Sequence, residues 1–269
     1  MNLQEFYRLI RLQPQIAAQL EETGRELDLT ALAPCLESLL EIQTAPSAYR
    51  RLTELLGGDP LQLLYCYLEC ARRAWEGYVR RGISAEIYAD TMRCFPRFLR
   101  ECQETHGRMY FDRGWWAYRQ TSMSLFRLGA LEYELSQHDG SPAVALHIPS
   151  DADFSPASVD RSLARAGEFF SAHYPEFAFD RYICNSWLLS PRLRPLLAGD
   201  SNILSFQNRF SILQDDPSDR EFVECLFQAP RDRKPERLPA ATSLQRGVKD
   251  LLLEGGSVGS ALGVMPAAC

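Results

Sequence analysis

The chain changes character after His106-Gly107, and this change limits its possible folds more than any other property of the sequence. Before this point, apolar residues recur at helical spacing, and the strongest local signals mark helix ends. After it, short aliphatic and aromatic runs bounded by turn residues predict strands. We therefore expect an α+β protein of two domains, an all-helical bundle over residues 1–106 and a mixed-sheet domain over residues 107–269.

The first 106 residues predict a bundle of five or six helices without any sheet. Asp59-Pro60 combines an N-cap with proline at the first helical position, and the apolar stripe that follows should end near Gly82. Ser84 is a second N-cap, with Glu86 in the first turn. Pro96 should break or kink the sixth helix, because proline lacks a backbone N–H.

The second domain opens with two runs, Leu125–Leu135 and Ala143–Pro149, whose intervening turn residues predict an antiparallel hairpin. Ser155-Pro156 should then begin a helix that ends near Pro175. Further along the chain, the sequence predicts a strand at 182–189, short helices at 191–197 and 202–206, strands at 210–213 and 222–227, and a helix at 243–253.

The composition of the chain limits the kinds of molecule that the protein is expected to bind. With 46% apolar and 24% charged residues, the protein is globular rather than disordered. The formal net charge of −6 argues against nucleic-acid binding, which needs a basic surface, and gives no attraction to anionic membranes. No apolar run reaches the roughly 18 residues of a membrane span. Because Glu5, Arg8 and Arg11 interrupt the start of the chain, no signal peptide is expected, and we predict a cytoplasmic protein.

The eight cysteines are scattered from Cys35 to Cys269 without a C-x-x-C pair, which predicts free thiols. Cys66 and Cys70 would share one face of a helix and could supply half of a metal site. They lie within an apolar stripe, however, and no histidine is close to them in sequence. Core packing is therefore the favoured interpretation, and no metal site is expected.

The predicted order of hairpin, helix, strand, helix, strand and strand is that of the core of the GNAT acyltransferase fold. Six segments are more specific: WWAYRQ (115–120), LFRLGALEYEL (125–135), LHIPSDADFSP (146–156), CNSWLLSP (184–191), SNILSFQNRF (201–210) and TSLQR (242–246). Together they resemble a bacterial family of acyltransferases with a helical N-terminal domain and a GNAT-like C-terminal domain. The resemblance covers essentially the whole chain.

This resemblance implies transfer of an acyl group from acyl-coenzyme A to a small-molecule amine, which attacks the thioester directly. In the GNAT fold, the strands before and after the long helix splay apart, and the thioester lies between them. Leu146–Pro149 and Ile183–Trp187 are therefore expected to run parallel and adjacent, and to diverge at their carboxyl ends. A pocket is expected in the resulting gap. The sequence does not define the oligomeric state.

Such a reaction needs a base, hydrogen-bond donors for the oxyanion, and an acid for the leaving thiolate. His147 is the first candidate base, because it ends the strand that should line the gap and an imidazole transfers protons near neutral pH. Glu132 is the second candidate, and Glu134, on the same strand face, is expected to contact the substrate. Alternatively, His147 is a hydrogen-bonded structural residue, and the two glutamates belong to a solvated face.

The opposite strand carries Cys184, Asn185 and Ser186. Asn185 and Ser186 are the remaining predicted substrate contacts. Cys184 could suggest an acyl-enzyme intermediate, but no histidine motif accompanies it and its neighbours are apolar, so buried packing is favoured.

The helix that begins at Ser155-Pro156 could receive the pyrophosphate of coenzyme A on its backbone N–H groups. The residues predicted to bind the cofactor are Ile148, Ser150, Ser155, Arg161 and Asn202. The glycine loop of GNAT enzymes, Q/R-x-x-G-x-G/A, is absent, and Asp151, Asp153 and Asp160 oppose a pyrophosphate by charge. Capping of the turn and the helix by Asp153 and Ser155 is an equally supported alternative.

Many GNAT enzymes protonate the leaving thiolate with a tyrosine in the motif N-x-x-A-x-x-L-Y-x-x-x-G-F. Here Asn202 starts a comparable helix, but Ser205 or Phe206 stands at the tyrosine position, and Ser205 is the remaining candidate acid. These departures keep a second function open, in which a catalytically silent GNAT-like module binds or senses a small ligand.

Overall fold

The structure is a computed structural model that describes residues 1–267 and divides into two compact units, residues 1–127 and 128–269. Each unit is described by itself. Within the described residues, no helix combines the length and the apolar character that crossing a bilayer requires.

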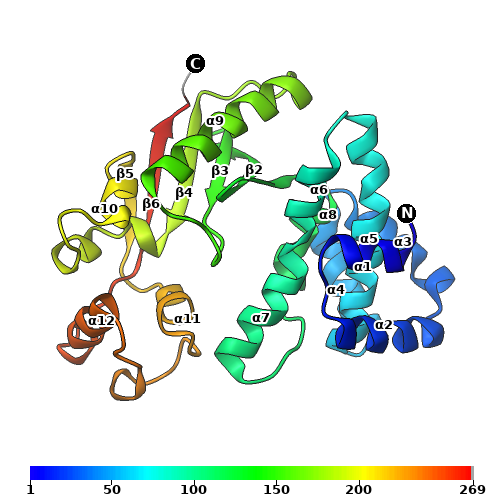
Figure 1. Ribbon diagram of the computed structural model, residues 1–269, viewed down its shortest axis with the longest axis horizontal. Helices are drawn as coiled ribbons and strands as arrows, with labels where there is room; N and C mark the ends of the chain where they lie inside the picture. Colours follow the sequence, from blue (N-terminus) through cyan, green and yellow to red (C-terminus); the bar gives the residue numbers. More distant parts are fainter. Residues whose placement is uncertain (268–269) are drawn as a thin grey trace. The chain divides into compact units, whose positions relative to one another are not determined.

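The first unit is helical (Figure 1). Seven helices precede Gly107, rather than five or six, and none of residues 1–106, all of which the structure describes, lies in a strand. The prediction of a helical region without sheet is therefore confirmed. The helices of the unit are α1 (Leu3–Leu9), α2 (Pro14–Glu26), α3 (Leu29–Leu39), α4 (Ala45–Leu55), α5 (Pro60–Arg80), α6 (Ala85–Met92), α7 (Cys94–His106) and α8 (Gly114–Thr121).

The long helix α5 contacts α1, α2, α3, α6 and α8. Asp59 begins it as predicted, because its carboxylate accepts hydrogen bonds from the N–H groups of Leu61 and Gln62 at 2.8 and 3.0 Å. The buried hydroxyl of Tyr67 donates to the backbone oxygen of Gly114 at 2.6 Å. This bond fastens α8 to α5, so the compact helical unit extends beyond residue 106, where the sequence predicted its end.

Pro96 separates α6 from α7, which confirms the predicted break. Helix α6 ends at Met92 and α7 begins at Cys94, so Pro96 lies in the first turn of α7, where a missing N–H leaves no helical bond unmade. Helix α7 ends at Gly107, whose φ of 72° is in the left-handed region that favours glycine.

A six-stranded mixed sheet follows, with its strands in the order β1-β2-β3-β4-β6-β5 (Figure 1). Strands β2 and β3 form the predicted antiparallel hairpin, β3 and β4 are parallel, and β6 is antiparallel to both β4 and β5. The strands are β1 (Leu125–Leu128), β2 (Leu131–His138), β3 (Ser141–His147), β4 (Arg181–Ser186), β5 (Ser211–Asp216) and β6 (Ser260–Pro266).

Two strand predictions are wrong, and the strand predicted at 182–189 ends at Ser186, where a 3₁₀ turn begins. The run Leu125–Leu135 forms β1 and β2 rather than one strand, because Gly129 turns the chain with a φ of 78°. Residues 222–227 lie in helix α11 (Glu221–Phe227) instead of a strand. A short apolar run has no periodicity that separates helix from strand, and here Phe222, Val223 and Phe227 are buried against other helical segments.

Strand β6 was not predicted, although it lies inside the sheet between β4 and β5. Its middle residue, Gly263, supplies no side chain to mark a strand in the sequence. A Cβ at this position would lie 3.0 Å from side-chain atoms of Leu189 and Phe210, so the absence of a side chain allows these two residues to approach the strand.

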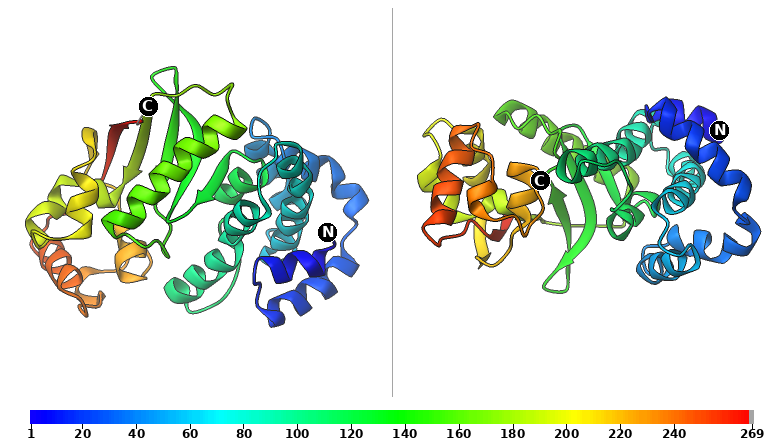
Figure 2. Two further views of the ribbon diagram at one scale, coloured as in Figure 1. Left: turned by 45° about the horizontal axis from the view of Figure 1, so that its top comes forward. Right: turned by 90° about the horizontal axis from the view of Figure 1, so that it is seen from below.

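Helix α9 (Pro156–His173) lies against one face of the sheet (Figures 1 and 2). Its Ser162 is fully buried and donates to the backbone oxygen of Leu128 at 2.5 Å. The same hydroxyl lies 3.1 Å from the backbone N of Leu131 and 3.0 Å from the hydroxyl of Tyr133. Tyr133 therefore points toward α9, and its neighbours on β2 point to the other face of the sheet.

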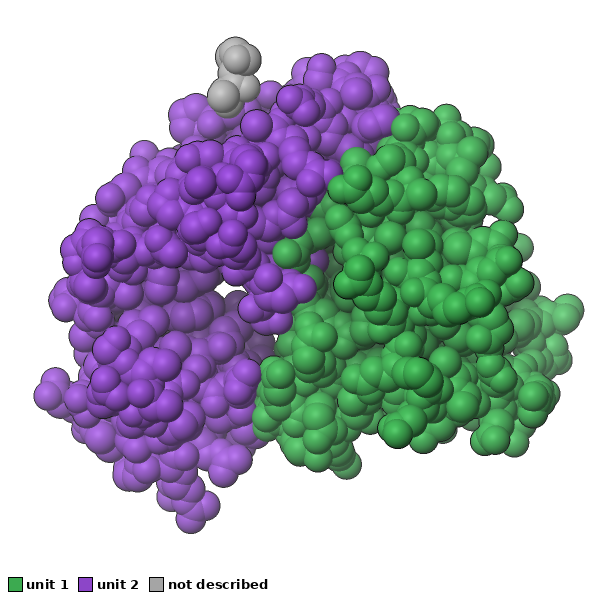
Figure 3. Space-filling view, in the orientation of Figure 1, with its two compact units in different colours: residues 1–127 green, residues 128–269 purple. Residues whose placement is uncertain are grey.

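Helices α11 and α12 (Ser243–Leu253) lie between β5 and β6 in the chain and form a separate helical layer with the 3₁₀ turn η3 (Pro235–Arg237). Figure 3 shows the surface of residues 128–269 hollowed between the part that carries the sheet and α9 and the part formed by these helices. The buried residues of the layer are Leu193, Phe222, Val223, Phe227, Ala229, Leu238, Val248, Leu252 and Val258.

Candidate active site

Strands β3 and β4 are adjacent and parallel, as predicted, and their ladder ends before the carboxyl ends of the strands. The described ladder pairs them in parallel only at Val144↔Tyr182 and Ala145↔Ile183. Beyond these pairs β3 continues to His147 and β4 to Ser186. The two strand ends are therefore not joined by a ladder, and the residues around them form the candidate site.

His147, at the end of β3, is hydrogen-bonded to Glu134 of β2. Its Nε2 lies 2.8 Å from Glu134 Oε2, and the two side chains are partly shielded, with exposures of 24% and 17%. An ionised carboxylate can only accept a hydrogen bond, so in a neutral imidazole this contact places the proton on Nε2. The bond fixes the orientation of the imidazole ring.

Glu132 completes this group of titratable side chains. It lies directly opposite His147 in the antiparallel ladder, and Glu134 lies opposite Ala145, so the three side chains share one face of the hairpin. Glu132 is only 3% exposed, and Glu134 is engaged by His147. The alternative that the glutamates form a solvated face is therefore wrong.

The hairpin turn explains why His147 meets the glutamates. Asp139 and Gly140 form a two-residue connection with φ of 51° and 75°, and the residues flanking it, His138 and Ser141, are paired. Counting back along both strands from this pair brings Glu132 opposite His147. The Asp-Gly pair was the sequence signal that could have revealed the interaction, which the sequence analysis missed.

On β4, the three predicted residues differ in environment. Cys184 is fully buried, and burial raises the pKa of its thiol to about 12, so it is not a nucleophile. The hydroxyl of Ser186 accepts a hydrogen bond from the Leu188 N–H at 3.2 Å and begins the 3₁₀ turn η1 (Trp187–Leu189). Asn185 is the exposed residue of the three.

At the amino terminus of α9, the carboxylate of Asp153 accepts one backbone hydrogen bond. Asp153 Oδ1 accepts a hydrogen bond from the Ser155 N–H at 3.0 Å. This backbone bond, followed by side-chain hydrogen bonds from Ser155 and Ser158, lowers the pKa of Asp153, and the charge of Arg161 adds to the effect. Pro156 has no N–H, and the Ser155 side chain makes no capping bond. Capping by Asp153 is confirmed, whereas capping by the Ser155 hydroxyl is not.

One of the three aspartates expected to oppose a pyrophosphate is already paired. Asp160, in the first turns of α9, lies 2.6 Å from the guanidinium of Arg209. Its charge is therefore largely compensated. The other two, Asp151 and Asp153, are exposed.

Helix α10 (Asn202–Gln207) lies next to this region, because its Phe206 ring packs 4.7 Å from the ring of Phe154, in the loop before α9. Asn202 is exposed in its first turn, and Ser205 is half-buried on the same helix. Ile148, half-buried, directly follows His147, and Ser150 is exposed. The structure thus joins Glu132, Glu134 and His147 on one hairpin, and places Ser205 on a separate helix.

Comparisons with known proteins agree with this architecture. Residues 1–123 match the N-acyltransferase N-terminal domain, and residues 125–265 match the GNAT-like C-terminal domain. No curated protein is significantly similar in sequence.

Solved structures share the fold over the full length of both chains. One is an acyltransferase in complex with decanoyl-CoA and teicoplanin, with a TM-score of 0.74 at 21% identity. Another is an acyltransferase in complex with CoA and 10C-teicoplanin, with a TM-score of 0.73 at 20% identity. A third, in complex with decanoyl-CoA, has a TM-score of 0.73 at 24% identity. The chain belongs to the family in which an N-acyltransferase N-terminal domain precedes a GNAT-like C-terminal domain.

Proposed function

We propose that the protein is an enzyme that transfers an acyl group from acyl-coenzyme A to a small-molecule amine by direct attack. Membership of the family supports this reaction class. The complexes of the similar acyltransferases with decanoyl-CoA and teicoplanin support a thioester donor and a small-molecule acceptor. The observation that carries the proposal is the His147–Glu134 pair beside the point where β3 and β4 separate.

In this proposal His147 is the general base. The thioester lies in the gap between β3 and β4, and the attacking amine loses its proton to Nδ1 of His147 as the new C–N bond forms. Glu134 holds the Nε2–H tautomer and stabilises the imidazolium. Glu132, opposite His147 in the ladder, is the second candidate for accepting the proton.

The proton then passes to the sulfur as the C–S bond breaks. Ser205 is proposed as a donor to the leaving thiolate, but a serine hydroxyl is a weak acid, and the imidazolium of His147 is the stronger proton source. Asn185, exposed on β4, is the proposed contact for the acceptor. Glu134 and Ser186 are proposed to shape the acceptor site through the bonds they already make to His147 and Leu188.

Coenzyme A is proposed to bind along the end of β3, the start of α9 and α10. The backbone N–H of Ile148, directly after the separated end of β3, is proposed to donate to the thioester oxygen. The remaining proposed contacts are Ser150, Ser155, Arg161 and Asn202. Since Asp153 already accepts from the Ser155 N–H, this terminus fits a pyrophosphate only partly, and the phosphates must displace that carboxylate or bind to side chains such as Arg161.

The same observation favours the second candidate function, binding or sensing of a small ligand without turnover. The Asp153 carboxylate already accepts a hydrogen bond at the amino terminus of α9, which weakens the attraction of this terminus for a bound anion. The two functions differ in one measurable respect, because only the enzyme releases free coenzyme A when an amine is supplied.

The proposal includes a cytoplasmic location. The seven described cysteines are free, and six of them are buried, as in proteins that fold in a reducing compartment. A net charge of −6 supports a small-molecule partner rather than nucleic acid or an anionic membrane.

The test combines a binding assay with a turnover assay. Acetyl-, longer acyl- and free coenzyme A should raise the melting temperature, and release of free thiol should follow when primary amines are added. His147→Ala should lower the rate by about a hundredfold or more, with little change in the melting shift. His138→Ala, at the opposite end of the hairpin, is the matched control and should retain activity.

Three results would count against parts of the proposal. Unchanged turnover in His147→Ala would remove this residue from the mechanism. Binding of acyl-coenzyme A without thiol release with any amine would favour the sensor. No binding of any coenzyme A species by folded protein would exclude the proposed donor.

A further inference from the structure

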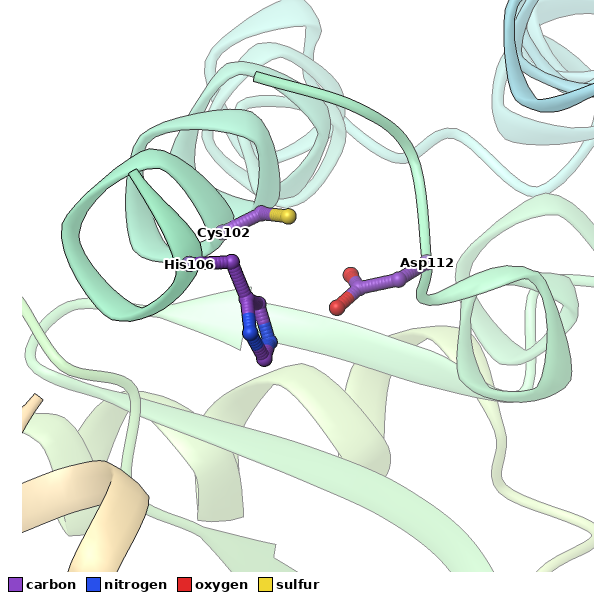
Figure 4. A group of neighbouring side chains, drawn as sticks. All are labelled: Cys102, His106 and Asp112. Carbon is purple, nitrogen blue, oxygen red and sulfur yellow. The ribbon is translucent and has the colours of Figure 1, made fainter. Parts of the chain in front are cut away.

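Three side chains that commonly bind metals converge at the end of α7, within residues 1–127. Cys102 and His106 are four residues apart and lie on one side of the helix, and Asp112 faces them from the segment that follows Gly107 (Figure 4). Their ligand atoms, one sulfur, one imidazole nitrogen and one carboxylate oxygen, all lie within 4.8 Å of one another. The left-handed Gly107 turns the chain after α7, so that Asp112 returns to the helix.

One oxygen of the Asp112 carboxylate lacks a hydrogen bond from any described residue. Its Oδ1 is buried and has no hydrogen-bond partner within the described residues. The guanidinium nitrogen Nε of Arg113 is 3.8 Å away, which is within ion-pair range but too long for a hydrogen bond. A buried carboxylate oxygen without a partner is costly, and a cation at this point would satisfy it.

Cys102, the sulfur ligand of the group, is buried and held by hydrogen bonds. Its side chain is 3% exposed, and hydrogen bonds from the backbone and the side chain of Tyr110 reach its sulfur. These bonds hold the sulfur in place beside His106 and Asp112. His106, by contrast, is exposed, so its ring can turn toward the other two ligands.

We propose that Cys102, His106 and Asp112 bind a zinc ion. Thiolate, imidazole and carboxylate are the usual protein ligands of zinc, and the soft sulfur disfavours magnesium and calcium. Tetrahedral bonds of about 2.0–2.3 Å require ligand atoms roughly 3.3–3.8 Å apart, so the three ligand atoms, which lie within 4.8 Å of one another, move closer together as the ion binds. The Cys102 thiol proton leaves to solvent as the Zn–S bond forms.

Three protein ligands leave a fourth position for water or a bound molecule. Asp112, Tyr110 and Phe111 also line a cavity of about 430 Å³ in the same unit, together with Tyr49 and Leu63. The ion would tie the segment after Gly107 to α7 and so hold one wall of this cavity. The site is distinct from the β3–β4 gap and does not depend on acyl transfer.

The first test uses the unaltered full-length protein. After incubation with zinc chloride and removal of free metal by gel filtration, elemental analysis should find one zinc per chain. Replacement by cobalt(II) should produce the near-ultraviolet charge-transfer absorption of a cobalt–thiolate bond. A protein that retains no zinc, or a cobalt form without this absorption, would overturn the proposal.

Variants locate the ion. His106→Gln removes an exposed ligand without disturbing the core and should reduce bound zinc at least tenfold. Asp112→Asn and Cys102→Ser should do the same, and Cys102→Ser should abolish the thiolate absorption. Cys225→Ser, which removes the exposed cysteine, is the matched control and should retain both signals. Full zinc retention in His106→Gln and Asp112→Asn, with circular dichroism confirming their folds, would overturn the assignment.

Discussion

Glu134 and His147 show how one hydrogen bond selects the chemistry of a residue. Without its partner, a neutral His147 could carry its proton on either ring nitrogen. With Glu134 accepting from Nε2, the proton of the neutral ring lies on Nε2, and in the proposed reaction Glu134 stabilises the imidazolium. The same bond engages Oε2 of Glu134.

We predict that Glu134→Gln lowers the turnover rate about tenfold or more with little change in the binding of acyl-coenzyme A, because an amide can donate to Nε2 and reverse the tautomer. Initial rates of thiol release, together with melting shifts, provide the measurement. Gln137→Glu, on the same strand near the turn, is a control for the change in charge. A rate equal to that of the unaltered protein would show that Glu134 does not position the base.

A second residue-scale prediction concerns Glu69, which bonds to Arg72 and Arg73 at 2.7 and 2.8 Å. Burial alone would raise the pKa of Glu69, but the two arginines outweigh it, and the pKa is lowered. A lowered pKa in the folded state stabilises the protein above the ordinary pKa of glutamate, and this stability is lost as the pH falls through the lowered value.

Glu69→Gln should therefore destabilise the protein by about 1–3 kcal/mol at neutral pH and by much less in acid. Urea midpoints of the two proteins, measured at about pH 7 and about pH 3, give the comparison. Glu76→Gln, on the same helix, tests whether any loss of charge on α5 has this effect. An equal difference between Glu69→Gln and the unaltered protein at both pH values would contradict the prediction.

At the scale of elements, the separation of β3 and β4 and the start of α9 define the two ends of the proposed donor site. The parallel ladder of β3 and β4 is short, which opens the sheet toward the loop that carries Ser150 to Ser155. A helix amino terminus ordinarily offers an anion site, but here Asp153 accepts a hydrogen bond from the N–H of Ser155, directly before the helix. At the proposed donor site, the pyrophosphate therefore competes with this carboxylate.

If the pyrophosphate binds at the start of α9, Asp151→Asn combined with Asp153→Asn should tighten coenzyme A severalfold, because two opposing charges are removed. Isothermal titration at low and high salt measures the effect, which should shrink as salt rises. Asp160→Asn is the control, since Arg209 already compensates this charge. An affinity that does not change in the double variant would place the pyrophosphate elsewhere.

At the scale of the whole molecule, the number of free thiols is a prediction that can be measured. The seven described cysteines are free, as the sequence predicted, and the eighth, Cys269, lies outside the described residues. Burial raises the pKa of Cys66 and of Cys184 to about 12 in each case, so both thiols stay protonated.

Titration of the unreduced protein in denaturant should therefore find eight thiols, the number that the sequence contains. In the folded protein, brief alkylation near neutral pH should modify the exposed Cys225 and spare Cys184. Cys225→Ala is the control and should lose most of this rapid labelling. Markedly fewer than eight thiols in denaturant would show that disulfides are present.

The local features of the fold follow from the sequence because their causes are local. Asp59-Pro60 begins α5, Ser84 begins α6, and Pro96 separates α6 from α7 through bonds or steric limits that span a few residues. The change from helix-forming to strand-forming sequence after Gly107 predicts the division into helices and sheet. The parallel arrangement of β3 and β4 was implied by the resemblance to the GNAT fold. The resemblance of six segments predicts the family that the domain matches confirm.

Other features depend on residues far apart in the chain. Residues 222–227 form a helix because a cluster of distant apolar residues surrounds them, and β6 is a strand because β4 and β5 pair with both its edges. The His147–Glu134 bond depends on the register of β2 and β3, in which a shift of one residue would turn the side chains to opposite faces. The meeting of Asp112 with Cys102 and His106 depends on the path of the chain after Gly107. Helical spacing places the last two on one side of α7, but only the folded chain brings the third ligand to them.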